Sequence, residues 1–385
     1  MIIKNKSIAL LALFFISTTT SDVRVLNEYV NLSTILFALF SFLHIKTILN
    51  AQNRLFDITY MMLIMMAVVS ASINQSGDKT VSHLVAYSCS ICFFGIFIGR
   101  IFSAFTIEQL KNAAIYALQT IALCVVFEVV INYYFDLPPF LPRVNDIIYD
   151  PPLIFFGIDL VRARGGMVES GHLALACIGI FAIIKALPDT PKKSFAATIS
   201  IFLIVILSNS VAAMLSLIAI VIFDIKPRIR YLIVGFLSLM VVLYLFAPAV
   251  ISKFSDQSYL DRINRIIIAY DVLEKKPQLL FFGVGPGNAP LWGIDGSIVS
   301  FLILLIFEYG FLSLLILMAL FLFLSKKIKK NFDGLKFNMV LCLFILQALS
   351  ISNFWYTSFW ILPGLLYFIS AKCTNKRIYL PPSVL

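Results

Sequence analysis

Residues 112–133 read NAAIYALQTIALCVVFEVVINY, a stretch in which Glu128 is the only charged side chain. A helix needs about 20 apolar residues to cross a hydrocarbon core about 30 Å thick, and this stretch meets that length. Similar stretches recur along the chain, and they lie at 7–20, 29–48, 57–73, 80–98, 172–187, 194–208, 211–224, 229–247, 298–324, 337–352 and 355–371. The pattern predicts an all-α polytopic membrane protein with about 12 transmembrane helices.

Composition agrees with this prediction. The chain has 385 residues, of which 61% are hydrophobic and 13% are charged. A soluble domain has about 25% charged residues. We therefore expect residues 1–385 to form a single integral membrane domain.

The net charge of +10 follows from the direction in which the helices cross the membrane. With the amino terminus inside, most of the 30 basic residues fall in the inside connections, as the positive-inside rule requires. We therefore expect both termini on the cytoplasmic side, and the positive charge gives no reason to expect a nucleic-acid partner. The basic residues left outside are few: Arg24, Lys79, Arg143, Arg162, Arg164, Lys253, Arg262, Arg265, Lys275 and Lys276.

Two outside connections are long, one at 135–171 and one at 249–297. Prolines interrupt the first connection, so a continuous helix is not expected there. The second has apolar residues at helical spacing between positions 256 and 276, which predicts an amphipathic helix. Arg262 and Arg265 are three residues apart and so share one side of that helix. We expect segment 298–324 to be one long, tilted helix.

The segment from Arg162 to His172 reads RARGGMVESGH, and it holds two arginines, a glutamate, a histidine and three glycines at the start of an apolar helix. Charged residues at the edge of a membrane domain are costly and usually mark a site. Two arginine-bearing loops suit a phosphate-bearing lipid, because the guanidinium group matches phosphate oxygens. The alternative is an interfacial loop whose arginines bind lipid headgroups.

Glu169 and His172 are the candidate bases, since a transfer reaction needs a group to take the proton of an acceptor hydroxyl. Each has an alternative role: Glu169 as an ion-pair partner of Arg162 or Arg164, and His172 as a helix-start residue bonded to backbone. Glu128 and Glu308 fall inside apolar helices, and each is expected to make a structural hydrogen bond to a neighbouring helix. His83 and His44 are assigned no role.

No metal or cofactor is expected. The chain has no D-x-D pattern and no acidic pair with the spacing of a two-metal site. Arginines alone are able to stabilise a departing diphosphate. Cys89 and Cys92 form a C-x-x-C inside an apolar segment, which favours buried thiols over zinc or redox chemistry.

The sequence resembles the bacterial O-antigen polymerase and O-antigen ligase superfamily over about residues 110–325. Three patterns in this order carry the resemblance: an arginine-glycine turn into a helix, late-loop arginines followed by G-x-G, and E-x-G in the next helix. Here they are R-x-x-G at 162–165 with E-S-G-H-L-A at 169–174, Arg262 and Arg265 followed by G-V-G at 283–285, and E-Y-G at 308–310. Ser170 stands where the family usually has proline, and Ser208-Asn209 stands where it has serine-arginine.

The resemblance implies a GT-C-like glycosyltransferase in the bacterial inner membrane, with the two long loops in the periplasm. Its donor and acceptor would be glycans linked to undecaprenyl diphosphate. Ligases of the family carry a histidine some nine or ten residues before E-x-G, and this chain has none there, which favours a polymerase of repeat units. The ligase stays as an alternative within the family, and a lipid-linked glycan flippase as an alternative from another class.

By the resemblance, Arg162 or Arg164, together with Arg262 or Arg265, holds the diphosphates. Membrane lipids are further expected partners, and the resemblance leaves open whether a chain-length regulator joins them. The identity of the sugars and the choice between O-antigen and capsule also stay open.

Overall fold

The computed structural model describes most of the chain. The described residues are 2–21, 23, 31–51, 53–74, 77–135, 153–155, 158–160, 162–167, 169–187, 194–224, 257–294, 298, 300–328, 334–351 and 354–374. Within these ranges the side chains of residues 2–6, 153–155, 158–160, 224, 257–262, 327–328 and 373–374 are not described. The expected apolar segment at 229–247 and most of the connection at 135–171 lie outside the described residues.

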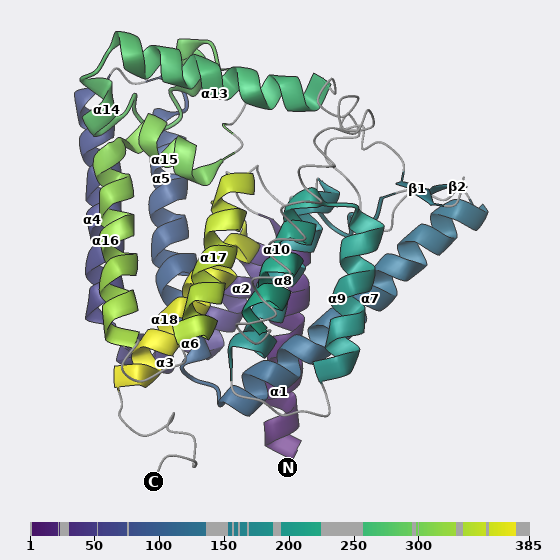
Figure 1. The fold of residues 1–385 in the computed structure, drawn as a ribbon. Coiled ribbons are helices and arrows are strands. Elements are labelled where there is room, and N and C mark those ends of the chain that lie inside the picture. Colours follow the sequence, from purple (N-terminus) through teal and green to yellow (C-terminus); the bar gives the residue numbers. More distant parts are fainter. Residues whose placement is uncertain are drawn as a thin grey trace.

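The described chain is a bundle of helices (Figure 1). The first half contains α1 (Ile2–Ser17), α2 (Leu32–Leu43), α3 (Ile45–Asn50), α4 (Arg54–Ile73), α5 (Thr80–Cys89), α6 (Phe97–Phe102), α7 (Ile107–Phe135) and α8 (Ser170–Ala186). The second half contains α9 (Ser194–Ser208), α10 (Val211–Asp224), α13 (Gln257–Lys275), α14 (Leu279–Phe282), α15 (Phe301–Tyr309), α16 (Phe311–Ile328), α17 (Gly334–Ser350) and α18 (Ile361–Thr374).

Short helical turns complete the bundle. The 3-10 turns are η1 (Thr18–Thr20), η3 (Ala289–Trp292) and η4 (Thr357–Trp360), and the π-helical turn η2 (Ser90–Ile96) joins α5 to α6. Two short strands, β1 (Leu153–Phe155) and β2 (Ile158–Leu160), pair antiparallel within the first long connection. The chain is otherwise helical over the described residues, as predicted.

Three described stretches are long and apolar enough to cross a membrane: Arg54–Ile73, Thr80–Phe102 and Ile107–Phe135. Shorter apolar helices accompany them, including Ser170–Ala186 and Gly334–Ser350. These features confirm the coarse prediction of a helical membrane protein.

Helix α8 is the centre of the bundle. Every side chain from Leu173 to Ile184 is buried, and the helix packs against α7, α9, α10, α17 and α18. A helix that is apolar on all sides is expected in such a central position. The arginine-bearing loop directly precedes this helix, so its position is tied to the best-packed element of the fold.

The prediction of one long helix at 298–324 was wrong. The chain breaks at Gly310, which ends α15 with φ +86° and begins α16. Helix α14 crosses at this point, and its backbone occupies the space that a side chain at 310 would need. The break therefore has a packing cause that the apolar pattern does not reveal.

Segment 29–48 is also divided, since α2 ends at Leu43 and α3 begins at Ile45 after the turn at His44. The amphipathic helix expected between 256 and 276 is confirmed as α13.

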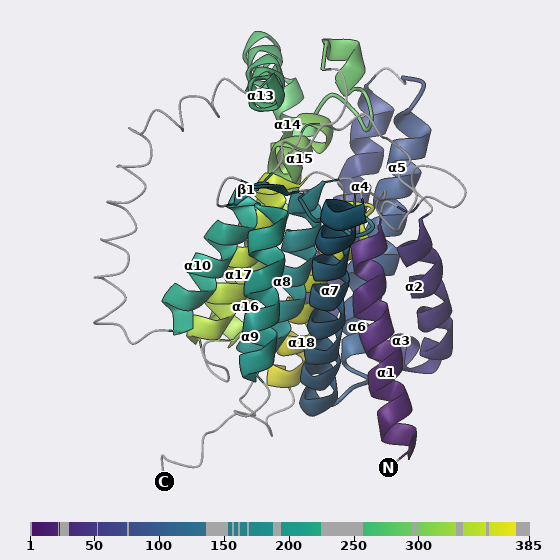
Figure 2. The ribbon, with the colours of Figure 1, turned by 90° about the vertical axis from the view of Figure 1, so that its right-hand side faces the viewer.

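The first and last described helices, α1 and α18, place their outer ends at the same end of the bundle (Figure 1). Helices α13, α14 and α15 lie at the opposite end, and both views show α13 lying across that end (Figures 1 and 2). The loop before α8 lies at this end too, because it contacts the last residues of α9. We call this the loop-bearing end.

Candidate functional site

Arg162 anchors the loop to α9. Its Nε donates to the carbonyl of Ser208 at 3.1 Å, and its Nη2 donates to the carbonyl of Asn209 at 2.8 Å. The backbone N–H of Ala163 adds a bond to the carbonyl of Leu207 at 3.0 Å. Carbonyls at the end of a helix lack intrahelical partners and carry partial negative charge, so a guanidinium there stabilises the fold.

Glu128 anchors the same loop to α7. Its carboxylate accepts the backbone N–H of Gly165 at 2.9 Å, and Gly165 has φ +57°. The neighbouring N–H of Gly166 donates to the carbonyl of Thr19 in η1 at 3.2 Å. Glu128 therefore makes a structural hydrogen bond, here to the loop before α8, where the sequence predicted a neighbouring helix as the partner.

Three chemically active side chains follow these anchors. Arg164, Glu169 and His172 are all partly exposed. Glu169 is the residue before α8, and its carbonyl accepts the N–H groups of His172 and Leu173. The His172 ring lies edge-on to Tyr356, with 5.6 Å between ring centroids. The turn before α8 thus carries these three residues at the loop-bearing end.

The second arginine pair lies on α13. Arg265 is partly exposed, and the backbone of Arg262 belongs to the helix, but the Arg262 side chain lies outside the described residues. Helix α13 contacts α15 and η3 and buries Ala269. The two arginine-bearing segments therefore share one end of the bundle.

The glycine loop at 283–288 and the E-Y-G at 308–310 come together. The N–H of Gly285 donates to the carbonyl of Glu308 at 3.1 Å, and the N–H of Gly287 donates to its carboxylate at 3.1 Å. The hydroxyl of Ser70 donates to the same carbonyl at 2.7 Å. The carboxylate of Glu308, which is 2% exposed, therefore makes a structural hydrogen bond to the glycine loop, where the sequence predicted a neighbouring helix as the partner.

His83 adds a group that the sequence did not assign. Its Nδ1 lies 3.7 Å from the carboxylate of Glu308, and its side chain is 17% exposed. Asn288 fixes this corner of the fold by accepting from the hydroxyl of Thr80 at 2.8 Å and the N–H of Gly77 at 3.1 Å. No local signal reveals the pairing, because His83 and Glu308 lie far apart in the chain.

Aromatic rings lie between His172, next to the arginine loop, and the corner formed by His83 and Glu308. Tyr356 contacts His172, Trp355 lies 6.2 Å from Tyr356, and Trp355 lies 6.3 Å from His83 between ring centroids. Trp355 is partly exposed, whereas Tyr356 is buried. Trp355 and Tyr356, which precede α18, therefore lie between the arginine loop and the His83–Glu308 corner.

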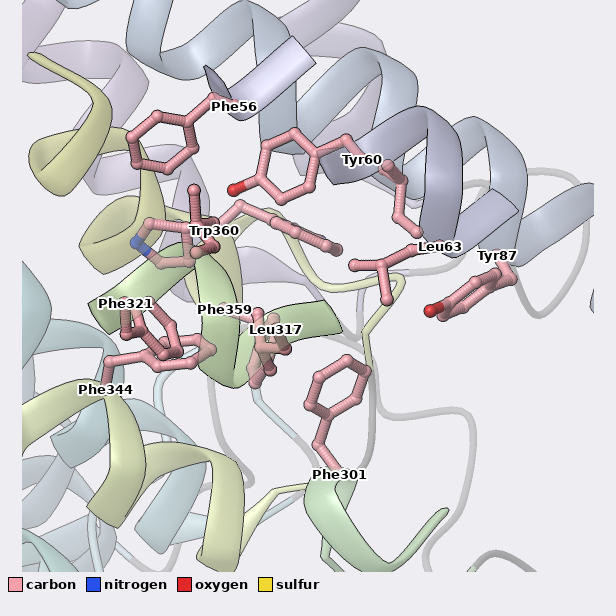
Figure 3. Close-up of a pocket in the computed structure, with 13 residues that line it drawn as sticks. Phe56, Tyr60, Leu63, Tyr87, Phe301, Leu317, Phe321, Phe344, Phe359 and Trp360 are labelled. Atoms are coloured by element: carbon pink, nitrogen blue, oxygen red, sulfur yellow. The ribbon is translucent and has the colours of Figure 1, made fainter. Parts of the chain in front are cut away.

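An apolar pocket lies among α4, α5, η2 and the helices from α15 to α18 (Figure 3). Tyr87 lines this pocket and stacks on Tyr309, with 4.2 Å between ring centroids. The pocket thus adjoins the residue next to Glu308. Its lining is Phe56, Tyr60, Leu63, Tyr87, Ile91, Phe301, Leu317, Leu320, Phe321, Phe344, Phe359, Trp360 and Pro363.

No group of three His, Cys, Asp or Glu side chains that could hold a metal ion is found in the described ranges. No protein-family model matches the chain, and a comparison with curated proteins finds no match.

Proposed function

We propose that this protein polymerises oligosaccharide repeat units carried on undecaprenyl diphosphate, on the periplasmic side of a bacterial inner membrane. The observation that carries the proposal is the anchored turn before α8, which presents Arg164, Glu169 and His172 at the end of the bundle that α13 crosses. An arginine-rich site beside helices that cross a membrane suits a substrate with a diphosphate head and a lipid tail.

The proposed topology has about 12 crossings, a GT-C-like arrangement and both termini in the cytoplasm. The loop-bearing end then faces the periplasm. The apolar helices support this topology. A further support is that α1 begins and α18 finishes at the same end of the bundle.

In the proposed reaction, an acceptor sugar hydroxyl attacks the anomeric carbon of the donor. A carbon–oxygen bond forms there, and the bond between that carbon and the diphosphate breaks. Undecaprenyl diphosphate leaves with the electron pair, and a base takes the hydroxyl proton. Arginines stabilise the charge that develops on the departing diphosphate.

Arg162 uses two donors to hold the end of α9, so part of its role is structural, and Arg164 is the arginine that the test addresses first. Arg265, with Arg262, is the proposed contribution from α13. Glu169 or His172 serves as the base or orients the acceptor.

The test is complementation of a bacterium that lacks its own polymerase, supplied with the matching repeat-unit genes. Wild-type protein should give a ladder of many repeats on a lipopolysaccharide gel. Arg164→Ala should lower the rate about 100-fold or more, since a lost oxyanion donor costs about 100- to 1000-fold. The polymer ladder should then collapse to single capped repeats.

Arg54→Ala is the matched control, because Arg54 is exposed at the first turn of α4, at the opposite end of the bundle. It should leave the ladder unchanged. A full ladder from Arg164→Ala and from the α13 arginine variants would contradict the proposal and favour loops that bind lipid headgroups. A single capped repeat with wild-type protein would favour the ligase or flippase alternative.

A further inference from the structure

We propose that His83 is the general base of this reaction and that Glu308 is the carboxylate that positions it. The inference rests on the polymerase assignment above and deepens it. It assigns the base role to His83, outside the arginine loop, and leaves Glu169 and His172 the role of orienting the acceptor. It gives a chemical role to a pair that the sequence separates by most of the chain.

The first step of the argument is the fixed position of Glu308. One carboxylate oxygen accepts the N–H of Gly287 at 3.1 Å, and the same oxygen lies 3.7 Å from Nδ1 of His83. Gly287 itself packs on the imidazole, since a Cβ added there would lie 2.9 Å from the His83 ring. The carboxylate, the glycine loop and the imidazole therefore form one packed corner.

The second step concerns the negative charge of Glu308. A carboxylate that is 2% exposed in an apolar helix carries a large desolvation cost. A neutral amide would accept the Gly287 N–H at lower cost. A negative charge is useful here because it stabilises the imidazolium that forms when a histidine takes a proton, as in carboxylate–histidine pairs of hydrolases. The separation of 3.7 Å is slightly longer than a hydrogen bond, and such contacts often tighten when substrate binds.

The third step is access for a sugar. The His83 side chain is 17% exposed, and its ring lies beside the partly exposed indole of Trp355. An indole offers a flat apolar face with a polar edge, which suits the face of a sugar ring. The aromatic connection then leads through Tyr356 to His172 and the arginine loop.

The proposed step is therefore as follows. The acceptor sugar lies against Trp355, and its hydroxyl oxygen bonds to the anomeric carbon of the donor. The hydroxyl proton passes to Nε2 of His83, while Nδ1–H faces Glu308. The bond from the anomeric carbon to the diphosphate breaks, and the diphosphate leaves with the electron pair. His83 then releases its proton to water.

The experiment uses the full-length protein in detergent with lipid-linked repeat units extracted from cells that lack this gene. His83→Ala should lower kcat about 100- to 10,000-fold, the range of general-base catalysis, and change KM little. Added imidazole should restore part of the turnover, which no loss of packing would permit. If His83→Ala does not fold, as judged by gel filtration, His83→Gln replaces it in the kcat and KM measurement.

Glu308→Gln tests the negative charge of Glu308 separately from its hydrogen bond to Gly287. The amide oxygen keeps an acceptor for Gly287 but removes the negative charge, so kcat should fall about 10-fold or more while gel-filtration behaviour stays unchanged. His44→Gln is the matched control, because His44 packs between Phe40 and Phe105 away from the site. It should keep wild-type turnover.

A kcat for the folded His83 variant within about threefold of wild type would overturn the inference, as would a folded His83→Ala without imidazole rescue. A Glu308→Gln with wild-type kcat would reduce Glu308 to a structural acceptor and overturn its positioning role. If Arg164→Ala abolishes turnover while His83→Ala does not, only this inference fails. If wild-type protein makes no polymer from the extracted glycolipid, the proposed function fails, and the inference fails with it.

Discussion

Substituting Gly310 with alanine should destabilise the protein far more than the same change at Gly293. Gly310 has φ +86° and ψ 160°, a backbone region that is almost restricted to glycine, and an L-residue there costs about 1–3 kcal/mol. The added Cβ would also overlap the carbonyl oxygen of Phe281 and lie 2.7 Å from the Cα of Phe282. Both are backbone atoms, so α14 or α15 must move, which costs about 1–3 kcal/mol more.

The expected total for Gly310→Ala is therefore about 2–6 kcal/mol. Gly293 is the control because it has φ +80° and ψ 16°, and a Cβ there would meet no atom within 4 Å. Its substitution should cost only the left-handed backbone penalty, about 1–2 kcal/mol. The difference between the two variants isolates the backbone crossing.

The assay is thermal unfolding of purified protein in detergent, followed by tryptophan fluorescence and by gel filtration of heated samples. Gly310→Ala should unfold at a clearly lower temperature than Gly293→Ala, and Gly293→Ala should unfold slightly below wild type. Gly283→Ala should resemble Gly310→Ala, since its Cβ would overlap the backbone of Glu308 from the other side of the crossing. Equal midpoints for Gly310→Ala and Gly293→Ala would refute the crossing as the cause of the helix break.

Three further changes test other contacts by the same thermal assay. Arg162→Ala should lower stability by about 1–3 kcal/mol, because the end of α9 loses two charged hydrogen bonds; a midpoint equal to wild type would contradict this anchor. Asp57→Asn should lower stability by at most about 1 kcal/mol, since the 2.9 Å ion pair between Asp57 and Arg100 is partly exposed. High salt should reduce the difference in midpoint between this variant and wild type. A larger loss of stability that does not depend on salt would contradict an ion pair. Lys111→Met should lower stability by about 1 kcal/mol or more, because it removes the 3.3 Å bond that the buried ammonium donates to the carbonyl of Leu187; a midpoint equal to wild type would contradict a stabilising role for that contact.

The helices themselves were predictable from the sequence, and the reason is chemical. A run of apolar residues that must satisfy its own backbone hydrogen bonds can do so as a helix, whatever its neighbours are. Segment 112–133 lies within α7, and the periodic segment between 256 and 276 lies within α13. Both predictions depended only on residues close together in the chain.

The breaks between helices were not predictable from the apolar pattern. Gly310 lies in an apolar run where a glycine is often tolerated, and the backbone of Phe281 that forces the break is distant in sequence. The apolar pattern therefore predicted one helix at 298–324, whereas the crossing of α14 produced two.

The candidate site, too, was predicted in part from the sequence and decided in part by the fold. The sequence alone placed two arginines, a glutamate and a histidine between 162 and 172, because charge is rare in so apolar a chain and stands out wherever it occurs. It could not separate Arg162 from Arg164, which have the same local surroundings. Only the fold directs Arg162 to the carbonyls that end α9, and only the fold brings His83 beside Glu308, because contacts between distant segments depend on how complete helices pack.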